Sequence, residues 1–323
     1  MKSLKSLSLL AACLLALPSA WAAPTSSLYP ISQDNRWGFV DKTGAVIIAP
    51  QFDRVGEFSG SLAPAQLSRW GYIGTDGKFV VNPIFDKAEP FSEGLAAVNS
   101  RRLFGYIGTD GKYVVNPIYE NAGPMVEGRA AVEQARLYGY IDKTGKLVIP
   151  CQFEEASPFS EGLALVTIGK RYGFVDPDGK LAITPQYDRA ASFSDGLAGF
   201  RQNGLWGFID KSGKTIIQPQ FEEVLGFGDG LAPARVGKLW AFIDKSGKIV
   251  VTPQFEEAQS FSEGMACVRL AKRWGFIDKS GKFSINPIWD EAGSFTNGVA
   301  RVKLGRKTGY IDTTGKYIWN PSL

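Results

Sequence analysis

Histidine is absent from this 323-residue sequence, and cysteine and methionine occur only three times each. Without histidine the chain cannot build a Ser-His-Asp triad, bind a metal through imidazole, or use imidazole in acid-base catalysis. Cys151 and Cys267 lie far apart in the sequence, which excludes a zinc site of the usual Cys/His type. The phosphate-binding pattern Gly-x-x-x-x-Gly-Lys is also missing. Asp and Glu are therefore the only candidates for catalysis, and we expect no cofactor and no metal ion.

Long hydrophobic runs are also missing, apart from one near the N-terminus. Leu7 to Leu17 is apolar, two lysines precede it, and Ala20-Trp21-Ala22 places small residues where a signal peptidase cuts. The run is too short to span a membrane. We predict a signal peptide over residues 1–22 and export to the periplasm or the cell exterior. Leu10-Ala11-Ala12-Cys13 resembles a lipoprotein box, so a lipid anchor on that cysteine is the alternative.

Neither sign of charge is in large excess. The sequence has 36 basic and 32 acidic residues, and removal of residues 1–22 takes away two lysines and no acid. The mature chain would then carry 34 basic against 32 acidic residues. Nucleic-acid-binding proteins usually display a strongly basic face, so this balance argues against a nucleic-acid partner.

One nine-residue stretch, Trp206-Gly207-Phe208-Ile209-Asp210-Lys211-Ser212-Gly213-Lys214, recurs along the whole chain. Its copies are spaced 33 residues apart once and 34 apart every other time. Such a fixed period indicates a repeat architecture. The other copies start at Trp37, Trp70, Phe104, Tyr138, Tyr172, Trp240, Trp274 and Thr308. The mature chain, residues 23–323, is thus predicted to be one domain of nine tandem units.

Each unit is predicted to be a three-stranded antiparallel meander. Trp37–Asp41 is short, aromatic and β-branched, Lys42-Thr43-Gly44 is a tight turn, and Ala45–Ala49 is a second strand ended by a proline. A third strand, such as Leu163–Val166, precedes each pair. The last unit ends at its second hairpin strand. The aspartates at the strand-turn junction are expected to accept hydrogen bonds from turn amides: Asp41, Asp142, Asp176, Asp210, Asp244, Asp278 and Asp312.

Two local features of the unit are the connector between strands and the glycine inside the aromatic strand. In the connectors, Phe255, Ala258 and Phe261 are spaced three apart, which suggests a helical or 3₁₀ turn. A glycine inside a strand, such as Gly207, indicates a close neighbour or a local twist. We expect an aromatic ring of an adjacent strand or unit to lie over it; the alternative is that the glycine merely permits a local twist. The two cysteines are expected to be buried small apolar residues.

The fold class that follows is all-β. We expect the tandem units of about 34 residues to stack as a superhelical β-solenoid, because no unit of this size can bury its faces alone. A closed, propeller-like ring is the alternative. The chain is expected to be a monomer, and its strands of four to six residues are too short for a transmembrane barrel.

The repeats resemble the WG-repeat family, named for its Trp-Gly pair. The family's core stands complete at Trp206–Lys214 and Trp274–Lys282, and Trp240–Lys248 has Ala241 in place of glycine. The resemblance covers about residues 28–323 and implies a bacterial origin and a β-rich repeat fold. It implies no activity. Departures occur at Gly74, Gly108, Met125-Val126 and Thr308.

Two groups of charged residues could carry a function. The acidic pairs could serve glycoside hydrolysis, which uses two carboxyl groups, but residues repeated in most units favour a structural role. These pairs are Glu154/Glu155, Glu222/Glu223, Glu256/Glu257 and Asp290/Glu291. Basic residues before the aromatic strand could line up as a ladder that binds an anionic polymer, or could simply be solvated turns. The ladder consists of Arg36, Arg69, Arg102, Arg171, Arg273 and Lys307.

The sequence therefore favours a non-catalytic scaffold that presents an extended surface to a protein or a cell-envelope glycan. A carbohydrate hydrolase that uses Asp or Glu is the alternative. A calcium site at the Asp-Lys-x-Gly turns is not expected, because that sequence offers too few oxygen ligands.

Overall fold

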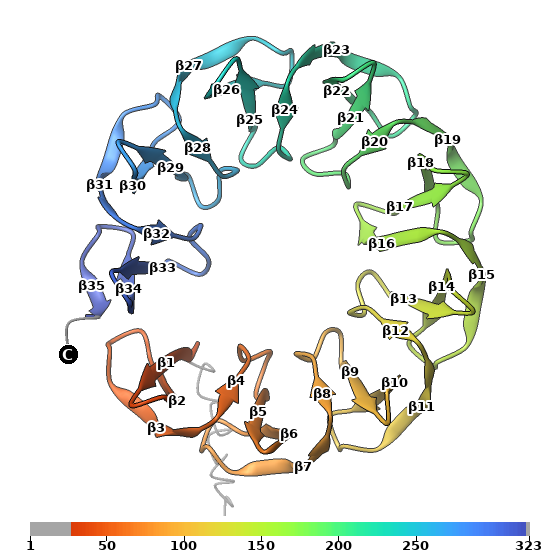
Figure 1. The fold of residues 1–323 in the computed structure, drawn as a ribbon, viewed down its shortest axis with the longest axis vertical. Coiled ribbons are helices and arrows are strands. Elements are labelled where there is room, and N and C mark those ends of the chain that lie inside the picture. The colour runs from red at the N-terminus through yellow and green to blue at the C-terminus, as the bar shows by residue number, and fades with distance from the viewer. Residues whose placement is uncertain (1–26, 321–323) are drawn as a thin grey trace, which may run out of the picture.

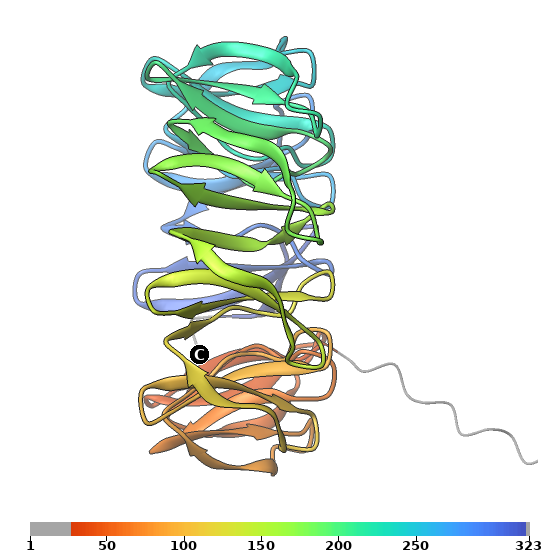
Figure 2. The same cartoon turned by 90° about the vertical axis from the view of Figure 1, so that its right-hand side faces the viewer.

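The computed structural model of the protein describes residues 27–320. Nine small antiparallel β-sheets follow one another around a ring, as in a β-propeller, and no strand crosses the centre (Figure 1). From the side, the strands are seen to run across the thickness of the ring (Figure 2). The predicted signal peptide and the alternative anchor at Cys13 lie outside the described residues. Within residues 27–320, no helix is long and apolar enough to cross a bilayer.

We number the sheets as blades 1 to 9 in chain order; blade 1 has three strands and the others have four. Blades 1 to 3 contain β1 (Tyr29–Gln33), β2 (Arg36–Val40), β3 (Val46–Phe52), β4 (Arg54–Val55), β5 (Ala63–Leu67), β6 (Arg69–Ile73), β7 (Phe79–Phe85), β8 (Lys87–Ala88), β9 (Leu95–Ser100), β10 (Leu103–Gly108) and β11 (Tyr113–Tyr119). Blades 4 to 6 contain β12 (Asn121–Ala122), β13 (Arg129–Gln134), β14 (Leu137–Asp142), β15 (Leu147–Phe153), β16 (Glu155–Ser160), β17 (Leu163–Ile168), β18 (Arg171–Val175), β19 (Leu181–Tyr187), β20 (Arg189–Ala190), β21 (Ala198–Gln202), β22 (Leu205–Ile209) and β23 (Thr215–Phe221). Blades 7 to 9 contain β24 (Glu223–Val224), β25 (Leu231–Val236), β26 (Leu239–Asp244), β27 (Ile249–Phe255), β28 (Glu257–Ala258), β29 (Ala266–Leu270), β30 (Arg273–Ile277), β31 (Phe283–Trp289), β32 (Glu291–Ala292), β33 (Val299–Leu304), β34 (Lys307–Asp312) and β35 (Tyr317–Trp319).

Each blade is a simple antiparallel meander, and blade 6 shows the pattern. Its strands pair in the order β20-β21-β22-β23. After β23 a single residue, Glu222, leads into β24 of the next blade. The three longer strands are those predicted from the sequence, but the proline does not end the last of them as predicted, since β3 runs through Pro50 and β23 through Pro219. The short first strand has no counterpart in that prediction.

The connectors are not helical, and that prediction is wrong. Between the short strand and the next strand of blade 8, Ser262 and Met265 form an isolated β-bridge around a tight turn. The two turn residues, Glu263 and Gly264, both have positive φ angles, 54° and 81°. This is the conformation of turns that close β-hairpins. The connector's apolar side chains are nevertheless buried between two blades, which explains their regular spacing.

Gly207 lies opposite a bulge in the neighbouring strand. Trp206 pairs with Phe221 and Phe208 with Ile217, so three residues of β23 face this one glycine. A Cβ atom on Gly207 would lie 2.3 Å from the carbonyl oxygen of Ile217. Glycine is needed because another backbone approaches closely. The expectation of an aromatic ring over this glycine is wrong, since the nearest atoms belong to the backbone of β23.

The hydrophobic core lies between consecutive blades. At one junction, Phe208 and Phe221 of blade 6 pack with Phe227 and Ile243 of blade 7, and all four side chains are buried. Equivalent clusters occur at the other junctions along the chain. Each blade is therefore stabilised mainly by its two neighbours, as expected for a repeat protein. Cys267 is buried in one of these clusters as predicted, whereas Cys151 is only partly buried.

The ring closes at a further junction between blade 9 and blade 1. Ile31 and Val40 pack there against Val299 and Tyr310. The Tyr310 hydroxyl group donates a hydrogen bond to the carbonyl oxygen of Pro30, 2.7 Å away. The preferred prediction of an open superhelical solenoid is therefore wrong, and its alternative, a closed propeller-like ring, is confirmed. In the ring the two end blades cover each other, whereas a solenoid would leave both outer faces exposed.

Candidate binding surfaces

The meander places two sets of recurring turns on opposite faces of the ring. One set, before each aromatic-glycine strand, includes the turns next to Arg36, Arg69, Arg171 and Arg273; we name this the arginine face. The other set comprises the Asp-Lys-x-Gly turns and the connector turns, which contain Glu93 and its counterparts; we name this the glutamate face. Because the strands run across the thickness of the ring, each turn set lies at one end of them (Figure 2).

Four of the six predicted ladder residues form ion pairs on the arginine face. Arg36 contacts Asp53 and Arg69 contacts Asp86, each at 2.5 Å. The other two pairs are Arg171 with Asp188 and Arg273 with Asp290. Each acid is the single residue between the last strand of one blade and the first strand of the next. We name these residues the junction acids.

The junction acids connect neighbouring blades. Asp86 contacts Arg69 of blade 2 and also accepts a hydrogen bond, at 2.8 Å, from the backbone N–H of Arg101 in blade 3. The Arg69 side chain, followed by that amide, lowers the pKa of Asp86 below its ordinary value. The charge of these four arginines is thus balanced by an acid. Whether the ladder binds an anionic polymer remains a prediction.

The remaining two ladder residues differ from these four. Arg102 lies in the turn itself with φ 74°, because Leu103 occupies the position directly before Phe104. Lys307 does stand directly before Thr308, which takes the place of the aromatic residue in blade 9. Lys307 has no ion pair among residues 27–320. The structure therefore pairs four of the six ladder residues with acids, each in a different blade, and leaves the other two cations without such a pair among residues 27–320.

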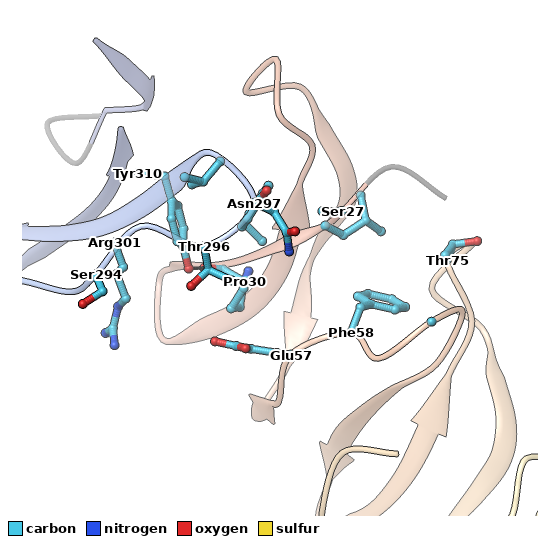
Figure 3. A pocket seen from close by; sticks show the side chains of 14 residues that line it. Ser27, Pro30, Glu57, Phe58, Thr75, Ser294, Thr296, Asn297, Arg301 and Tyr310 are labelled. Atoms are coloured by element: carbon cyan, nitrogen blue, oxygen red, sulfur yellow. Dashed lines mark hydrogen bonds between the residues drawn. The ribbon is translucent and has the colours of Figure 1, made fainter. Parts of the chain in front are cut away.

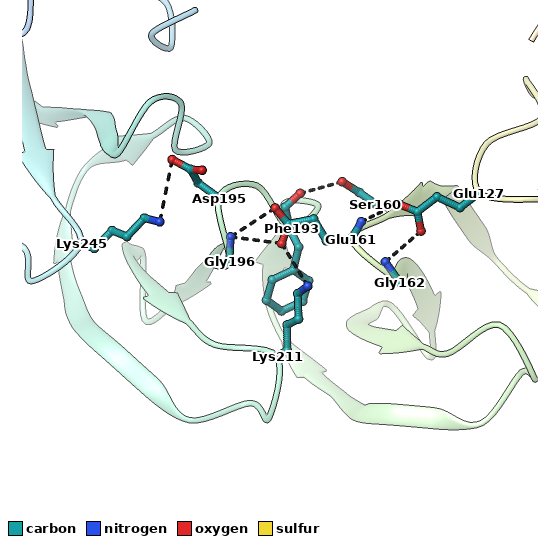
Figure 4. A network of polar contacts seen from close by, with 9 residues as sticks. All are labelled: Glu127, Ser160, Glu161, Gly162, Phe193, Asp195, Gly196, Lys211 and Lys245. Carbon is teal, nitrogen blue, oxygen red and sulfur yellow. Dashed lines mark hydrogen bonds and ion pairs between the residues drawn. The ribbon is translucent and has the colours of Figure 1, made fainter.

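A series of carboxylates connects the blades on the glutamate face. Glu127 of blade 4 accepts hydrogen bonds from the backbone N–H groups of Glu161 and Gly162 in blade 5, both at 2.8 Å (Figure 4). Glu161 in turn accepts from Gly196 of blade 6 and contacts Lys211 at 3.2 Å. The same contact to the next turn is made by Glu93, Glu127, Glu161, Asp195, Asp229 and Glu263.

The serine of the Phe-Ser-Glu-Gly segment adds a second link. Its hydroxyl group donates to the carbonyl oxygen of the phenylalanine one blade further on, as Ser160 does to Phe193 at 2.8 Å (Figure 4). Ser262 makes the same contact with Phe295. The repeated segment is therefore a joint between blades. The carboxylate series begins at Glu93 because blade 2 has Gly60 at this position, and in blade 9 the position is Asn297.

The turn aspartates behave as predicted. The Asp210 carboxylate accepts hydrogen bonds from the amides of Ser212 and Lys214 and from the Ser212 hydroxyl group. These contacts, the hydroxyl group first, lower the pKa of Asp210. Within residues 27–320, no three His, Cys, Asp or Glu side chains converge as a potential metal site.

The acidic pairs proposed as catalytic candidates also make local contacts. The first member of each pair is a junction acid, and Glu154, for example, accepts from the amides of Gly169 and Lys170. Glu222, Glu256 and Asp290 accept from turn amides in the same way. The second members contact Tyr172, Arg235, Arg269 and Lys303, in the order Glu155, Glu223, Glu257 and Glu291. All eight carboxylates therefore have partners.

Two cavities lie at the seam between blade 9 and blade 1. The first, of about 370 Å³, is lined by Glu57, Asn297 and Tyr310 among others, on the side of the glutamate face (Figure 3). The second, of about 610 Å³, is lined by Asp34 and Lys307 among others, on the side of the arginine face. Pro30 and Arg301 line both cavities.

Arg301 is a seam residue that the sequence analysis missed. It pairs with Tyr310 across β33 and β34, and its side chain is exposed. The residues at the same register in the other blades are small or apolar: Pro30, Pro64, Ala97, Ala131, Leu165, Gly199, Pro233 and Cys267. An alignment of the nine units column by column would have revealed this single charged residue.

Comparisons with known proteins agree with the repeat and the ring. A sequence model of the WG containing repeat family matches residues 37–68, 70–101, 104–135, 138–172, 172–206, 206–240, 240–273 and 274–307. None of the curated proteins matches the sequence. The structure is similar to that of a eukaryotic initiation factor, with a TM-score of 0.62, 11% identity, and coverage of 90% of this chain and 95% of that chain.

A second similar structure is dihydro-heme d1 dehydrogenase NirN in complex with DHE. Its TM-score is 0.52, its identity 13%, and the match covers 94% of this chain and 75% of that chain. At such low identity both likenesses concern the fold alone. The family matches span most of residues 37–307, and each runs from the aromatic-glycine strand of one blade to the second strand of the next, as 70–101 does from β6 to β9. The chain belongs to the WG containing repeat family.

Proposed function

We propose that the protein is a non-catalytic binding scaffold, exported to the periplasm or the cell exterior. It presents the surface of its ring to a protein or a cell-envelope glycan. Repeat proteins of this kind commonly bind through extended surfaces that several units share. The nine blades offer two such faces, each with turns whose sequences differ from blade to blade.

The observation that carries this proposal is the use of the recurring carboxylates. Junction acids such as Asp86 bind turn amides and arginines, and connector acids such as Glu161 bind the next blade. Turn aspartates such as Asp210 hold their own hairpins. These acids therefore serve the joints and turns of the ring, which supports a structural use of the residues that could otherwise catalyse hydrolysis.

The hydrolase alternative has no comparable support. Glycoside hydrolysis uses two carboxyl groups about 5–10 Å apart. Of the residues that line the two seam cavities, Glu57 is the only acid in the smaller and Asp34 the only acid in the larger. We therefore put forward the scaffold alone.

Export is supported by the basic, apolar and small-residue order of residues 1–22. The test is fractionation of the producing cells followed by mass spectrometry of the intact protein. We expect a mature chain that begins at Ala23 and occurs in the periplasm or medium. Full-length protein in the cytoplasm would contradict export, and a lipidated chain beginning at Cys13 would replace free secretion by membrane anchoring.

Binding is tested with the mature chain immobilised and exposed to cell-envelope extract. We expect specific retention that is lost after protease treatment of the extract for a protein partner, or after periodate treatment for a glycan. Heat-unfolded mature chain on the same support is the control. Turnover of envelope polysaccharide by the mature chain, with no retention of any component, would contradict a scaffold function.

A further inference from the structure

The seam between blades 9 and 1 differs from the other junctions because blade 1 has no short first strand among the described residues. In blade 3 that strand pairs Lys87 with Asn99 and Ala88 with Val98. The positions at the same register in blade 1 are Ser32 and Ile31 of β1. Within residues 27–320, β1 pairs only with β2, so no strand covers its other edge, where the Pro30 carbonyl accepts a hydrogen bond from the Tyr310 side chain. An exposed edge of this kind is a template for an added strand.

At other junctions a cation before the aromatic strand pairs with a junction acid, whereas at the seam only the cation is present among the described residues. Arg69 and its counterparts directly precede the aromatic strand and contact a junction acid. Lys307 occupies the same position in blade 9 but has no acid partner among the described residues. At the other junctions the acid also binds an amide of the following turn, as Asp86 binds that of Arg101. In blade 1 that turn is formed by Asp34 and Asn35.

Arg301 adds a positive charge at the centre of the seam. In the other blades this position is small or apolar, yet here an arginine lines both seam cavities and has no ion pair in the described chain. The larger cavity is also lined by Arg306 and Lys307, against one acid, Asp34. Charge complementarity therefore favours an anionic occupant.

Tyr310 shows how the seam is altered locally. Tyr72, Tyr106 and Tyr140 each donate a hydrogen bond to a carbonyl oxygen 17 residues further on, in the connector of the next blade. Tyr310 instead donates to Pro30 of β1. At the seam, the Tyr310 hydroxyl group therefore contacts strand β1 itself and not a connector. The cavities on either side of this contact run along β1 from one face of the ring towards the other.

Under the export proposal, the segment of the chain that corresponds to the short first strand of blade 1 is removed with the signal peptide. By the register of β1 and β5, residues 20–21 correspond to Arg54–Val55, the short strand of blade 2. Those residues belong to the predicted signal peptide, which is removed at Ala22. We therefore consider an occupant from another chain.

We propose that the seam binds an extended, acidic segment of a partner protein, which adds to the edge of β1 as the short strand of blade 1. The segment would supply Asp or Glu at the junction position, next to Lys307, followed two residues later by Ala or Val. This order is that of the chain's own junctions, such as Asp290-Glu291-Ala292. Backbone hydrogen bonds would give affinity and the acid would give specificity, as in other cases of strand addition. The inference rests on the proposed scaffold function and names the chemistry of its partner.

The experiment measures the fluorescence anisotropy of a labelled peptide with the sequence of residues 288–294, Ile-Trp-Asp-Glu-Ala-Gly-Ser, titrated with the mature chain. We expect saturable binding that weakens as salt is raised. A peptide with Asn in place of Asp290 is the matched ligand control and should bind about tenfold more weakly or worse, because it lacks the charge. Equal binding of the two peptides, or no binding of either, would overturn the proposal.

Two substitutions locate the site. Arg301→Ala introduces the residue that blades 3 and 4 have at this register, Ala97 and Ala131, so the variant is expected to fold. Lys307→Glu reverses the charge that faces the acid. Each should weaken peptide binding about tenfold or more. The control is Lys170→Ala, which removes one cation at the position of Arg306 but in blade 5. Equal weakening by Lys170→Ala would show a general charge effect and overturn the site.

Other occupants give distinct results. A chain that begins at Leu28 tests residues 23–27 as an internal competitor; binding seen only with this chain would make those residues the occupant and overturn the proposal. A concentration-dependent dimer that Arg301→Ala dissociates would replace the partner by a second copy. If the Arg301→Ala and Lys307→Glu variants retain an envelope component as well as the parent does, the scaffold function stands. The seam is then not its binding site, and the proposal is overturned.

Discussion

At the residue scale, the fit between neighbouring strands depends on a missing side chain. Gly207 faces three residues of β23, and a Cβ atom there would lie 2.7 Å from the backbone nitrogen of Pro219. Blade 7 has the same register shift but carries Ala241 at the corresponding position, fully buried. The bulge therefore tolerates a methyl group only where the surrounding backbone has adjusted to it.

Exchange of these two residues tests this argument. Gly207→Ala should reduce the free energy of unfolding by about 1–3 kcal/mol, because a rigid backbone must shift. Ala241→Gly should cost no more than about 1 kcal/mol, mainly through conformational entropy. Denaturant unfolding of both variants gives the comparison. A Gly207→Ala variant as stable as Ala241→Gly would mean that the bulge is not a tight contact.

The turn aspartates predict a loss of stability in acid. Asp41, Asp142, Asp210, Asp244, Asp278 and Asp312 all have pKa values lowered from 3.8, first by the hydroxyl group of the turn Ser or Thr. The unfolded chain then binds more protons than the folded chain as the pH falls through this range. The stability that these aspartates contribute is present above pH 3.8, their ordinary pKa. It is lost as the pH falls through the lower pKa values that they have in the folded state.

Denaturant midpoints between pH 7 and pH 2.5 measure this effect. We expect the midpoint to change little down to about pH 5 and to fall below about pH 4. Asp210→Asn should be less stable than the parent at pH 7 but should lose less on acidification. A midpoint that rises on acidification, or the same acid loss in Asp210→Asn, would contradict the assigned role.

At the scale of the element, the connector turn acts as a joint between blades. Glu161 belongs to a turn of blade 5, accepts from the amide of Gly196 and contacts Lys211, both in blade 6. Ser160 in the same turn donates to Phe193, also in blade 6. One four-residue segment thus fixes the position of the following blade without any shared strand.

Removal of one carboxylate tests the joint. Glu161→Ala should lower the free energy of unfolding by about 1 kcal/mol and speed hydrogen exchange at the Gly196 amide, which loses its acceptor. Lys112→Ala is the control, because Lys112 is highly exposed and pairs only with Asp110 of its own turn. Unchanged exchange at Gly196 in the Glu161→Ala variant would show that the carboxylate does not hold the joint.

These elements also show what the sequence could predict. The meander and the turn aspartates depend on contacts within one unit, so their pattern is visible in any single copy, and the fixed period gives the number of units. The connector was mispredicted because its apolar spacing fits a helix equally well. Its true conformation depends on contacts with residues 34 positions away, such as that between Glu127 and the amide of Glu161.

At the scale of the whole molecule, ring closure depends on small rotations added over nine blades. No single unit encodes that sum, so the sequence left solenoid and ring as alternatives. The contact that distinguishes them, Tyr310 to Pro30, joins residues 280 positions apart. The ladder of basic residues could likewise be predicted from the sequence, but the ion pairs between its arginines and the junction acids could not. The acids that neutralise Arg36 and Arg69 stand 17 residues further on, after the third long strand.

Deletion of one period tests closure against simple stacking. Removal of Trp206–Leu239 joins Leu205 to Trp240 in register and leaves eight blades. In an open array the loss would be one unit's share of stability. In the ring, the eight remaining blades must each rotate further or the seam must open. We therefore expect a larger loss, together with loss of the contacts between blades 9 and 1.

Small-angle scattering and denaturant midpoints of this eight-blade chain give the answer. An opened seam would appear as a larger maximum dimension than that of the parent, with a lower midpoint. Deletion of Trp206–Glu222, half a period, is the comparison; it exposes two sheet edges and should aggregate. An eight-blade chain that scatters as a smaller closed ring and unfolds at the parent's midpoint would mean that the joints rotate freely. In that case the Glu161-type contacts would not set the angle between blades, and closure would be a property of hydrophobic packing alone.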